Sequence, residues 1–163
     1  MLEKIAHPIE PLYSKDSIIL ILGSFPSQKS REQMFFYGHP QNRFWRVLSA
    51  VFECDTPETV DQKRELILSH KIALWDVIAS CEIEGSADSS IKNVVPNDFT
   101  EILNTADINQ IFVNGKTAHK FYNKYIKDTL GREAVCLPST SPANAAWSVE
   151  KLVSAWKIIL ESM

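Results

Sequence analysis

The segment from 35 to 45 holds the chain's densest group of side chains that could do chemistry. Its sequence, FFYGHPQNRFW, combines aromatic rings with amide, imidazole and guanidinium groups. Aromatic rings stack on planar bases, and amides and imidazoles read the edges of such bases through hydrogen bonds. Phe44 and Trp45 also suit the buried face of a helix, whereas Tyr37 and Asn42 are hard to bury without polar partners. The segment therefore indicates recognition of a planar, base-like group.

Four more segments are polar or turn-forming, and each follows a run of apolar residues. They are GSFPS at 23–27, Asp76, NGK at 114–116 and LPSTSPAN at 137–144. In the first, Gly23 permits close approach of the backbone and Pro26 fixes the chain, which leaves nearby N–H groups free to face a ligand. Taken alone, this short pattern also fits an ordinary turn between a strand and a helix.

The apolar pattern predicts the scaffold that brings these segments together. The run at 17–22, which is aliphatic from Ile18 onward, indicates a strand buried on both faces, which is typical of a parallel sheet. Further strands are predicted at 72–78, 111–113 and 134–137, helices at 59–71, 99–105, 116–126 and 149–160, and a polar loop at 81–98. This alternation predicts an α/β fold, a three-layer α/β/α sandwich with a central, mostly parallel four-stranded sheet. The polar segments then fall beyond the carboxyl ends of the strands, where such sheets place their chemistry.

The overall composition is that of one globular domain of 163 residues, with 45% hydrophobic and 23% charged residues. No apolar run approaches the roughly 20 residues of a membrane-spanning helix, so membrane insertion is not expected. A net charge of -3 argues against an extended footprint on a polyanion but allows a local basic patch. Three scattered cysteines and four histidines without metal-ligand spacing predict reduced thiols in a cytoplasmic protein that uses neither a metal nor a cofactor.

Five motifs span most of the chain: GSFPS at 23–27, FYGHPQNRFW at 36–45, LWDVI at 74–78, NGKTAH at 114–119 and LPSTSPANA at 137–145. Taken in that order, they resemble the uracil-DNA glycosylase superfamily, and specifically its hypoxanthine (deoxyinosine) DNA glycosylase branch, with the mismatch-specific uracil branch as nearest relative. The resemblance implies a monomeric enzyme that flips a deaminated base out of DNA and hydrolyses its N-glycosidic bond. Because the motifs contain no lysine other than Lys116, we expect a monofunctional enzyme that leaves an abasic site.

The resemblance also implies which residues take part in catalysis. In the uracil enzymes, the third residue of the first motif positions the hydrolytic water, and this residue is Phe25 here. Phenylalanine cannot hold a water, so we expect Asn42 to take this role. Ser139 stands where the uracil enzymes carry the histidine that stabilises the departing base, and it is grouped with Asn42 as catalytic.

A second set of residues is predicted to bind the flipped base. Tyr37 matches the aromatic residue that stacks on the base, and Asp76 matches the base-reading asparagine of the uracil enzymes. Hypoxanthine carries a ring N–H beside a carbonyl oxygen, so a carboxylate at Asp76 would accept from the N–H. The oxygen would then face backbone N–H groups of the 23–27 turn, which places Ser24 and Phe25 in the base-binding set.

The remaining motif residues are predicted to contact DNA. In the last motif, Ala143 replaces the intercalating leucine of the uracil enzymes, so Asn144 is expected to fill part of the gap left by the base. A small positive rim is expected around Arg43 and Lys116, because the acidic excess lies elsewhere in the sequence. The full predicted set is Ser27, Arg43, Lys116, Ser141, Pro142 and Asn144.

Two other functions fit the same residues. The first is removal of uracil opposite guanine, which keeps the reaction and changes the base. The second belongs to another class: a non-catalytic α/β module that binds a free nucleotide or nucleobase through Asp76 and Tyr37. Release of a free base distinguishes the enzyme from the binding module, and the identity of the base distinguishes the two enzymes.

Overall fold

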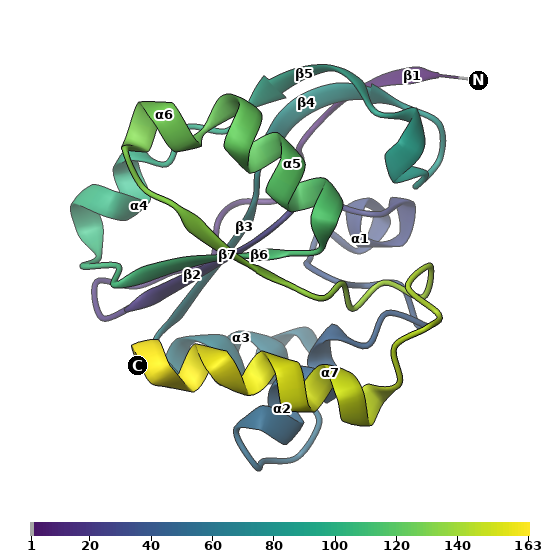
Figure 1. Ribbon diagram of the computed structural model, residues 1–163. Helices are drawn as coiled ribbons and strands as arrows, with labels where there is room; N and C mark the ends of the chain where they lie inside the picture. The colour runs from purple at the N-terminus through teal and green to yellow at the C-terminus, as the bar shows by residue number, and fades with distance from the viewer. Residues whose placement is uncertain (1) are drawn as a thin grey trace.

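A four-stranded sheet lies at the centre of the molecule (Figure 1). The computed structural model describes residues 2–163. Every neighbouring pair of strands in this sheet is parallel, and the order is β3–β2–β6–β7. The strands are β2 (Ile19–Gly23), β3 (Ile72–Asp76), β6 (Gln110–Asn114) and β7 (Ala134–Leu137). The predicted four-stranded parallel sheet is confirmed.

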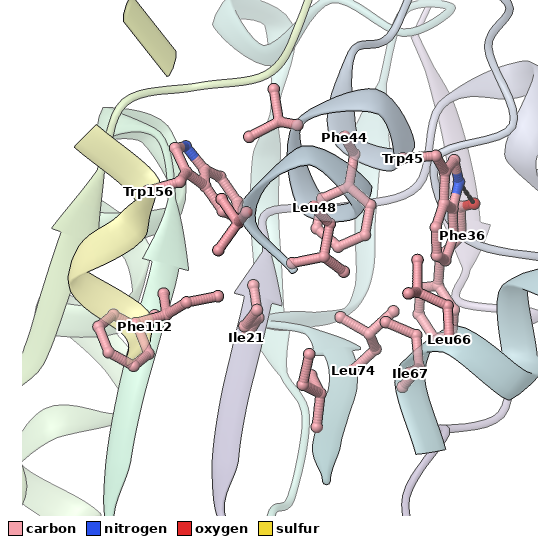
Figure 2. Close-up of a cluster of buried hydrophobic side chains, with 14 of the residues drawn as sticks. Ile21, Phe36, Phe44, Trp45, Leu48, Leu66, Ile67, Leu74, Phe112 and Trp156 are labelled. Atoms are coloured by element: carbon pink, nitrogen blue, oxygen red, sulfur yellow. Dashed lines mark hydrogen bonds between the residues drawn. The ribbon is translucent and has the colours of Figure 1, made fainter. Parts of the chain in front are cut away.

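Strand β2 shows why this sheet must be covered on both faces. All its residues are buried, and their side chains alternate between two hydrophobic clusters. Ile19 and Ile21 belong to one cluster, whereas Leu20 and Leu22 belong to the other. Figure 2 shows the first cluster, in which Ile21 lies among side chains of the sheet and the helices packed on it. Alternation with period two thus sends successive aliphatic side chains into separate cores.

Helices form the two outer layers of the sandwich (Figure 1). They are α1 (Gln28–Gln33), α2 (Phe44–Val51), α3 (Val60–Ser69), α4 (Thr100–Thr105), α5 (Lys116–Tyr125), α6 (Lys127–Leu130) and α7 (Val149–Trp156), which continues as the 3-10 helix η2 (Lys157–Ser162). Helices α2, α3 and α7 cover one face of the sheet, and α4, α5 and α6 cover the other. The three-layer α/β/α prediction is therefore confirmed. Among the helices of residues 2–163, none combines the length and apolar character needed to cross a membrane.

Local signals set several helix ends. The Thr59 side chain accepts from the backbone N–H of Gln62, and the Gln62 side chain accepts from the N–H of Thr59, which forms a capping box at the start of α3. Ser148 caps α7 by a single bond, in which its side chain accepts from the N–H of Lys151. The predicted helices at 59–71, 99–105 and 116–126 correspond to α3, α4 and α5 with small shifts at their ends.

A second, antiparallel sheet corrects the predicted loop at 81–98. It has the order β1–β4–β5, with β1 (Glu3–Ala6), β4 (Ile78–Ile83) and β5 (Lys92–Pro96), and η1 (Asp88–Ser90) lies between β4 and β5. Both outer strands are short and largely exposed, so neither carries a long apolar run that would mark it as a strand in the sequence.

The predicted strand at 72–78 is two strands that belong to different sheets. Strand β3 ends at Asp76, and β4 begins two residues later. The N–H groups of Val77 and Ile78 bond back to the carbonyls of Gly23 and Ser24, at 2.8 and 3.2 Å. This bend holds Asp76 at the end of the parallel sheet and turns the chain away from it.

Candidate active site

A pocket of about 300 Å³ opens beyond the carboxyl ends of all four parallel strands. Gly23 ends β2, Asp76 ends β3, Asn114 ends β6, and the 139–143 segment follows β7. This volume lies at the lower end of the range for small-ligand sites and suits a group of limited size.

Most of the predicted site residues meet in this pocket. Those that line it are Ser24, Phe25, Ser27, Tyr37, Asn42, Asp76, Ser139, Ser141 and Pro142. Arg43, Lys116 and Asn144 are not part of the lining. The lining also includes Asn114, which the sequence placed at a strand end without a specific role, and His39, Ser86, Asp88 and Thr140, which it did not assign to the site.

Asp76 forms a buried acceptor at the pocket, and His7 fixes its orientation. The His7 Nε2 atom lies 2.7 Å from Asp76 Oδ2, and the two side chains are only 3% and 5% exposed. The backbone N–H of Ile9 donates to His7 Nδ1 at 3.2 Å, so the neutral ring carries its proton on Nε2 and donates to Asp76. His7 is 69 residues away from Asp76 in the sequence, and no local spacing indicated this contact.

The other carboxylate oxygen of Asp76 lies against Gly23. A Cβ atom at Gly23 would sit 2.4 Å from Asp76 Oδ1 and 3.0 Å from the Tyr37 hydroxyl oxygen, Oη. Both polar atoms are therefore close to the same point, which only a residue without a side chain leaves open. Gly23 thus makes the space in which a carboxylate oxygen and a phenol hydroxyl lie near each other.

The Tyr37 side chain combines a packed ring with an unsatisfied hydroxyl. Its ring stacks on Phe44, with centroids 4.0 Å apart and planes inclined by 13°. Within residues 2–163, Tyr37 Oη is the one buried side-chain N or O atom that has no hydrogen-bond partner. Burial and then the charge of Asp76 hold the pKa of Tyr37 far above its usual value, while the nearby Asn114 amide, which is outside hydrogen-bond geometry, lowers it in part. The group is therefore a neutral phenol with a free O–H donor.

Asn42 is held in one orientation by a hydrogen-bond network. Its Oδ1 accepts from the Phe44 backbone N–H and from the Thr140 hydroxyl, both at 2.9 Å. Thr140 is fully buried, and its Oγ1 in turn accepts from Asn114 Nδ2 at 3.0 Å while its N–H donates to Asn114 Oδ1 at 3.1 Å. Because the Phe44 N–H can only donate, the Asn42 amide oxygen must face it. The Nδ2 group of Asn42, which has no partner among residues 2–163, is left for a ligand or water.

Arg43, which is predicted to contact DNA, binds the loop after β7 through backbone carbonyls. Its guanidinium group donates to the carbonyls of Thr140, Ser141, Asn144 and Trp147. The bonds to Ser141 and Asn144 measure 2.9 and 3.1 Å. A guanidinium has five N–H donors, so most of this group's capacity is used within the protein. Arg43 therefore positions the loop that carries other pocket residues.

Replacing Arg43 by lysine should lower the free energy of unfolding by about 1.5–3 kcal/mol, the usual contribution of hydrogen bonds to a charged group. Lysine keeps the charge but lacks the planar fork that reaches several carbonyls at once. Urea unfolding of Arg43→Lys measures the effect, and Arg46→Lys, at an exposed position of α2, is the matched control. Equal stability of the two variants would contradict the proposed positioning role.

Asn144 also has a contact within the loop. Its Nδ2 donates to the Ser139 carbonyl at 3.0 Å, and its backbone N–H donates to the Ser141 carbonyl. The side chain that the sequence nominates to fill the gap in the duplex is thus tied to its own loop, and the exposed tip is formed by Pro142 and Ala143. The Ser139 hydroxyl oxygen accepts from the N–H of Ser141 at 3.1 Å, which leaves its hydrogen free to donate.

Ser27 and Lys116 both lie at the start of a helix, but only Ser27 lines the pocket. Ser27 caps α1 by accepting from the N–H of Ser30 at 3.1 Å, and it also lines the pocket. Lys116 is exposed at the start of α5, directly after Gly115, whose φ is +95°. A Cβ on Gly115 would meet Ser139 at 3.0 Å, so this turn and the loop after β7 are in close contact. Lys116 thus stands beside the pocket loops without entering the pocket.

The connection between β4 and β5 supplies a wall of the pocket that the sequence did not predict. The Ser24 hydroxyl donates to Asp88 Oδ1 at 3.4 Å, and the N–H of Gln28 donates to the Ser86 hydroxyl at 2.8 Å. The pKa of Asp88 is raised, chiefly because surrounding atoms reduce the solvation of its carboxyl group. The hydrogen bond from the Ser24 hydroxyl lowers this pKa, and the charge of Asp76 raises it further. Residues 2–163 contain no group of three His, Cys, Asp or Glu side chains placed to hold a metal ion.

Comparison with known proteins defines the class to which this fold and pocket belong. The family model of the uracil DNA glycosylase superfamily matches residues 10–160, so the chain belongs to this superfamily. A hypoxanthine DNA glycosylase from Methanosarcina barkeri is 34% identical over 148 residues, which are 90% of this chain and 92% of that protein. A hypoxanthine DNA glycosylase from Methanosarcina acetivorans is 34% identical over 143 residues, with coverages of 86% and 89%.

A solved structure shows the same architecture. It is a solution NMR structure from Methanosarcina acetivorans, assigned provisionally as a uracil DNA glycosylase. The TM-score is 0.77 at 29% sequence identity, and the match covers 93% of this chain and 96% of that chain. The likeness therefore extends over nearly the whole fold.

Proposed function

We propose that this protein is a DNA glycosylase that removes hypoxanthine from deoxyinosine in DNA and leaves an abasic site. The observation that carries the proposal is a buried carboxylate, Asp76, at the floor of a small pocket in a uracil DNA glycosylase fold. The two hypoxanthine DNA glycosylases that are 34% identical over most of the chain support the same substrate.

The Asp76 carboxylate favours hypoxanthine over adenine, the undamaged base from which hypoxanthine arises by deamination. A carboxylate only accepts hydrogen bonds, and hypoxanthine offers a ring N–H at the position where adenine has a lone pair. Adenine would therefore place a lone pair against the Asp76 oxygen and leave the buried carboxylate without a partner, which costs binding free energy. Flipping the base into the pocket costs a few kcal/mol, and least for a weakly paired base.

Asn42 is the residue that we propose positions the hydrolytic water. Cleavage of an N-glycosidic bond produces an oxocarbenium-like sugar, and a loose transition state of this kind needs a placed water more than a strong base. A neutral amide is suited to placing the water and not to deprotonating it. The contacts from Phe44 and Thr140 fix the amide plane, so Nδ2 is the group available to hold the water oxygen.

The departing base needs stabilisation of its developing negative charge. The free hydrogen of the Ser139 hydroxyl and the backbone N–H groups of the turn at Ser24 and Phe25 are the donors that we propose for it. The pocket lining contains no lysine, so an amine that could form a Schiff base with the sugar is not part of it. The proposed enzyme is therefore monofunctional, and we propose that it acts as a monomer.

Lys116 is the proposed phosphate contact at the pocket rim. Replacing it by alanine should reduce the slope of log K against log salt concentration by about 0.9 for duplex DNA, because each neutralised phosphate releases counterions. Titrations of duplex binding at several salt concentrations measure this slope. Lys157→Ala, at an exposed position of η2, is the control and should leave the slope unchanged. An unchanged slope for Lys116→Ala would remove Lys116 from the DNA contact.

Single-turnover base release decides between hypoxanthine and uracil. Matched oligonucleotide duplexes carry either deoxyinosine or deoxyuridine opposite guanine at one position, and the rates of abasic-site formation are compared. We expect faster release of hypoxanthine, the base named for the two relatives that are 34% identical over most of the chain. Faster release of uracil would reject the proposed substrate and retain the reaction.

A further inference from the structure

The unsatisfied hydroxyl of Tyr37 is a polar group that the fold does not explain. A buried donor without a partner destabilises the folded protein, and native structures contain few of them. Tyr37 Oη is the buried side-chain polar atom that stays unpaired in the described part of the chain, and it belongs to a residue that lines the pocket. Its ring is fixed by the stack on Phe44, so the hydroxyl is held in place.

The position of this hydroxyl is complementary to Asp76. Tyr37 Oη and Asp76 Oδ1 both lie within 3.0 Å of the point that a Gly23 Cβ would occupy. One atom carries a hydrogen to donate, and the other accepts only. Since His7 occupies the other carboxylate oxygen, Oδ1 is the one that remains for a ligand. The pocket floor thus presents an acceptor and a donor next to each other.

We propose that Tyr37 is a base-reading residue whose hydroxyl donates to the carbonyl oxygen of the flipped base while Asp76 accepts from the adjacent ring N–H. This inference rests on the proposed glycosylase function and deepens it. The pair selects bases that carry an N–H beside a carbonyl, an edge that deamination creates. Adenine and cytosine carry an amino group and a lone pair at the corresponding positions, so they present the opposite pattern.

The contact also adds to the stabilisation of the departing base. As the N-glycosidic bond breaks, its electron pair moves onto the base, and part of the charge collects on the carbonyl oxygen. A fixed neutral donor at this oxygen stabilises the transition state without reorganisation. The proposed contact differs from stacking of the base on the Tyr37 ring, one face of which is already covered by Phe44.

The variant Tyr37→Phe tests the proposal, because it removes the hydroxyl and keeps the ring. We expect single-turnover release of hypoxanthine from an inosine duplex to fall by about 10- to 100-fold, the usual effect of losing a donor to a charged or developing anion. We also expect the Tm to stay equal or rise, because the hydroxyl has no partner to lose. Tyr125→Phe, on α5 outside the pocket lining, is the matched control.

Two results would overturn the proposal. Equal rates for the wild type and Tyr37→Phe would show that only the ring matters, as in stacking. A lower Tm together with a lower rate would show that the hydroxyl is part of the fold and acts through it. Absence of hypoxanthine release by the wild-type protein itself would instead reject the proposed glycosylase function, so the two failures are distinguishable.

Discussion

Replacing Asn42 by alanine is expected to lower the single-turnover rate of hypoxanthine release by about 100-fold or more. A water displaced by 1 Å from its productive position costs a loss of this order. The variant removes the Nδ2 group that we propose holds the water, and it also removes the acceptor for Phe44 and Thr140. The rate of abasic-site formation in an inosine duplex, with enzyme in excess, measures the effect.

A second variant separates the water contact from the structural contact. In Asn42→Asp, the carboxylate keeps both acceptor bonds, to the Phe44 N–H and the Thr140 hydroxyl, but it can only accept from a water and cannot donate to the water oxygen as Nδ2 does. We expect this variant to unfold at nearly the wild-type urea concentration and still to be slow. Release of hypoxanthine by the Asn42→Ala variant at the wild-type rate would show that another group positions the water.

Replacing Asp76 by asparagine is expected to lower hypoxanthine release by about 10- to 100-fold and to shift the preference toward uracil. The His7 Nε2–H can only donate, so the new amide would turn its oxygen toward His7 and its NH₂ group toward the pocket. The ring N–H of hypoxanthine would then face a donor instead of an acceptor. Uracil carries a carbonyl oxygen on both sides of its ring N–H, whereas hypoxanthine has a carbonyl on one side and a C–H on the other, so the new NH₂ group finds more acceptors on uracil.

Paired rates for inosine and uracil duplexes measure this shift in preference. Asp107→Asn, at an exposed position after α4, makes the same chemical change outside the pocket and should alter neither rate. If the ratio of the two rates is the same for Asp76→Asn as for the wild type, the carboxylate does not read the base edge.

The sequence predicts those parts of the fold whose burial is visible in the residue pattern. Ile19–Gly23 is buried on both faces, so an unbroken aliphatic run marks it as a central strand. The second sheet has no such mark, because β1 and β5 expose most of their residues and pair with β4 through contacts distant in sequence. The short segment that forms β5 lies within a longer polar stretch, and its sequence alone does not distinguish it from a loop.

The candidate site likewise contains residues that the sequence predicts and residues that it does not. Residues at the ends of parallel strands, such as Gly23, Asp76 and Asn114, are predictable because the fold class determines where these ends meet. The His7 contact with Asp76 depends on how the segment after β1 pairs with the edge strand β3, which no motif records. Arg43 shows a different limit, since an arginine that binds carbonyls of a loop distant in the sequence has the same sequence signature as one that binds phosphate.

The most direct test of the proposed function is the product that the wild-type protein forms from a duplex with a single deoxyinosine. Chromatography with mass detection measures free hypoxanthine, and alkaline cleavage of the strand measures abasic sites. We predict equal amounts of both products, formed without added metal or cofactor. Binding of the duplex or of free hypoxanthine without either product would contradict the proposal and would identify the protein as a base-binding module.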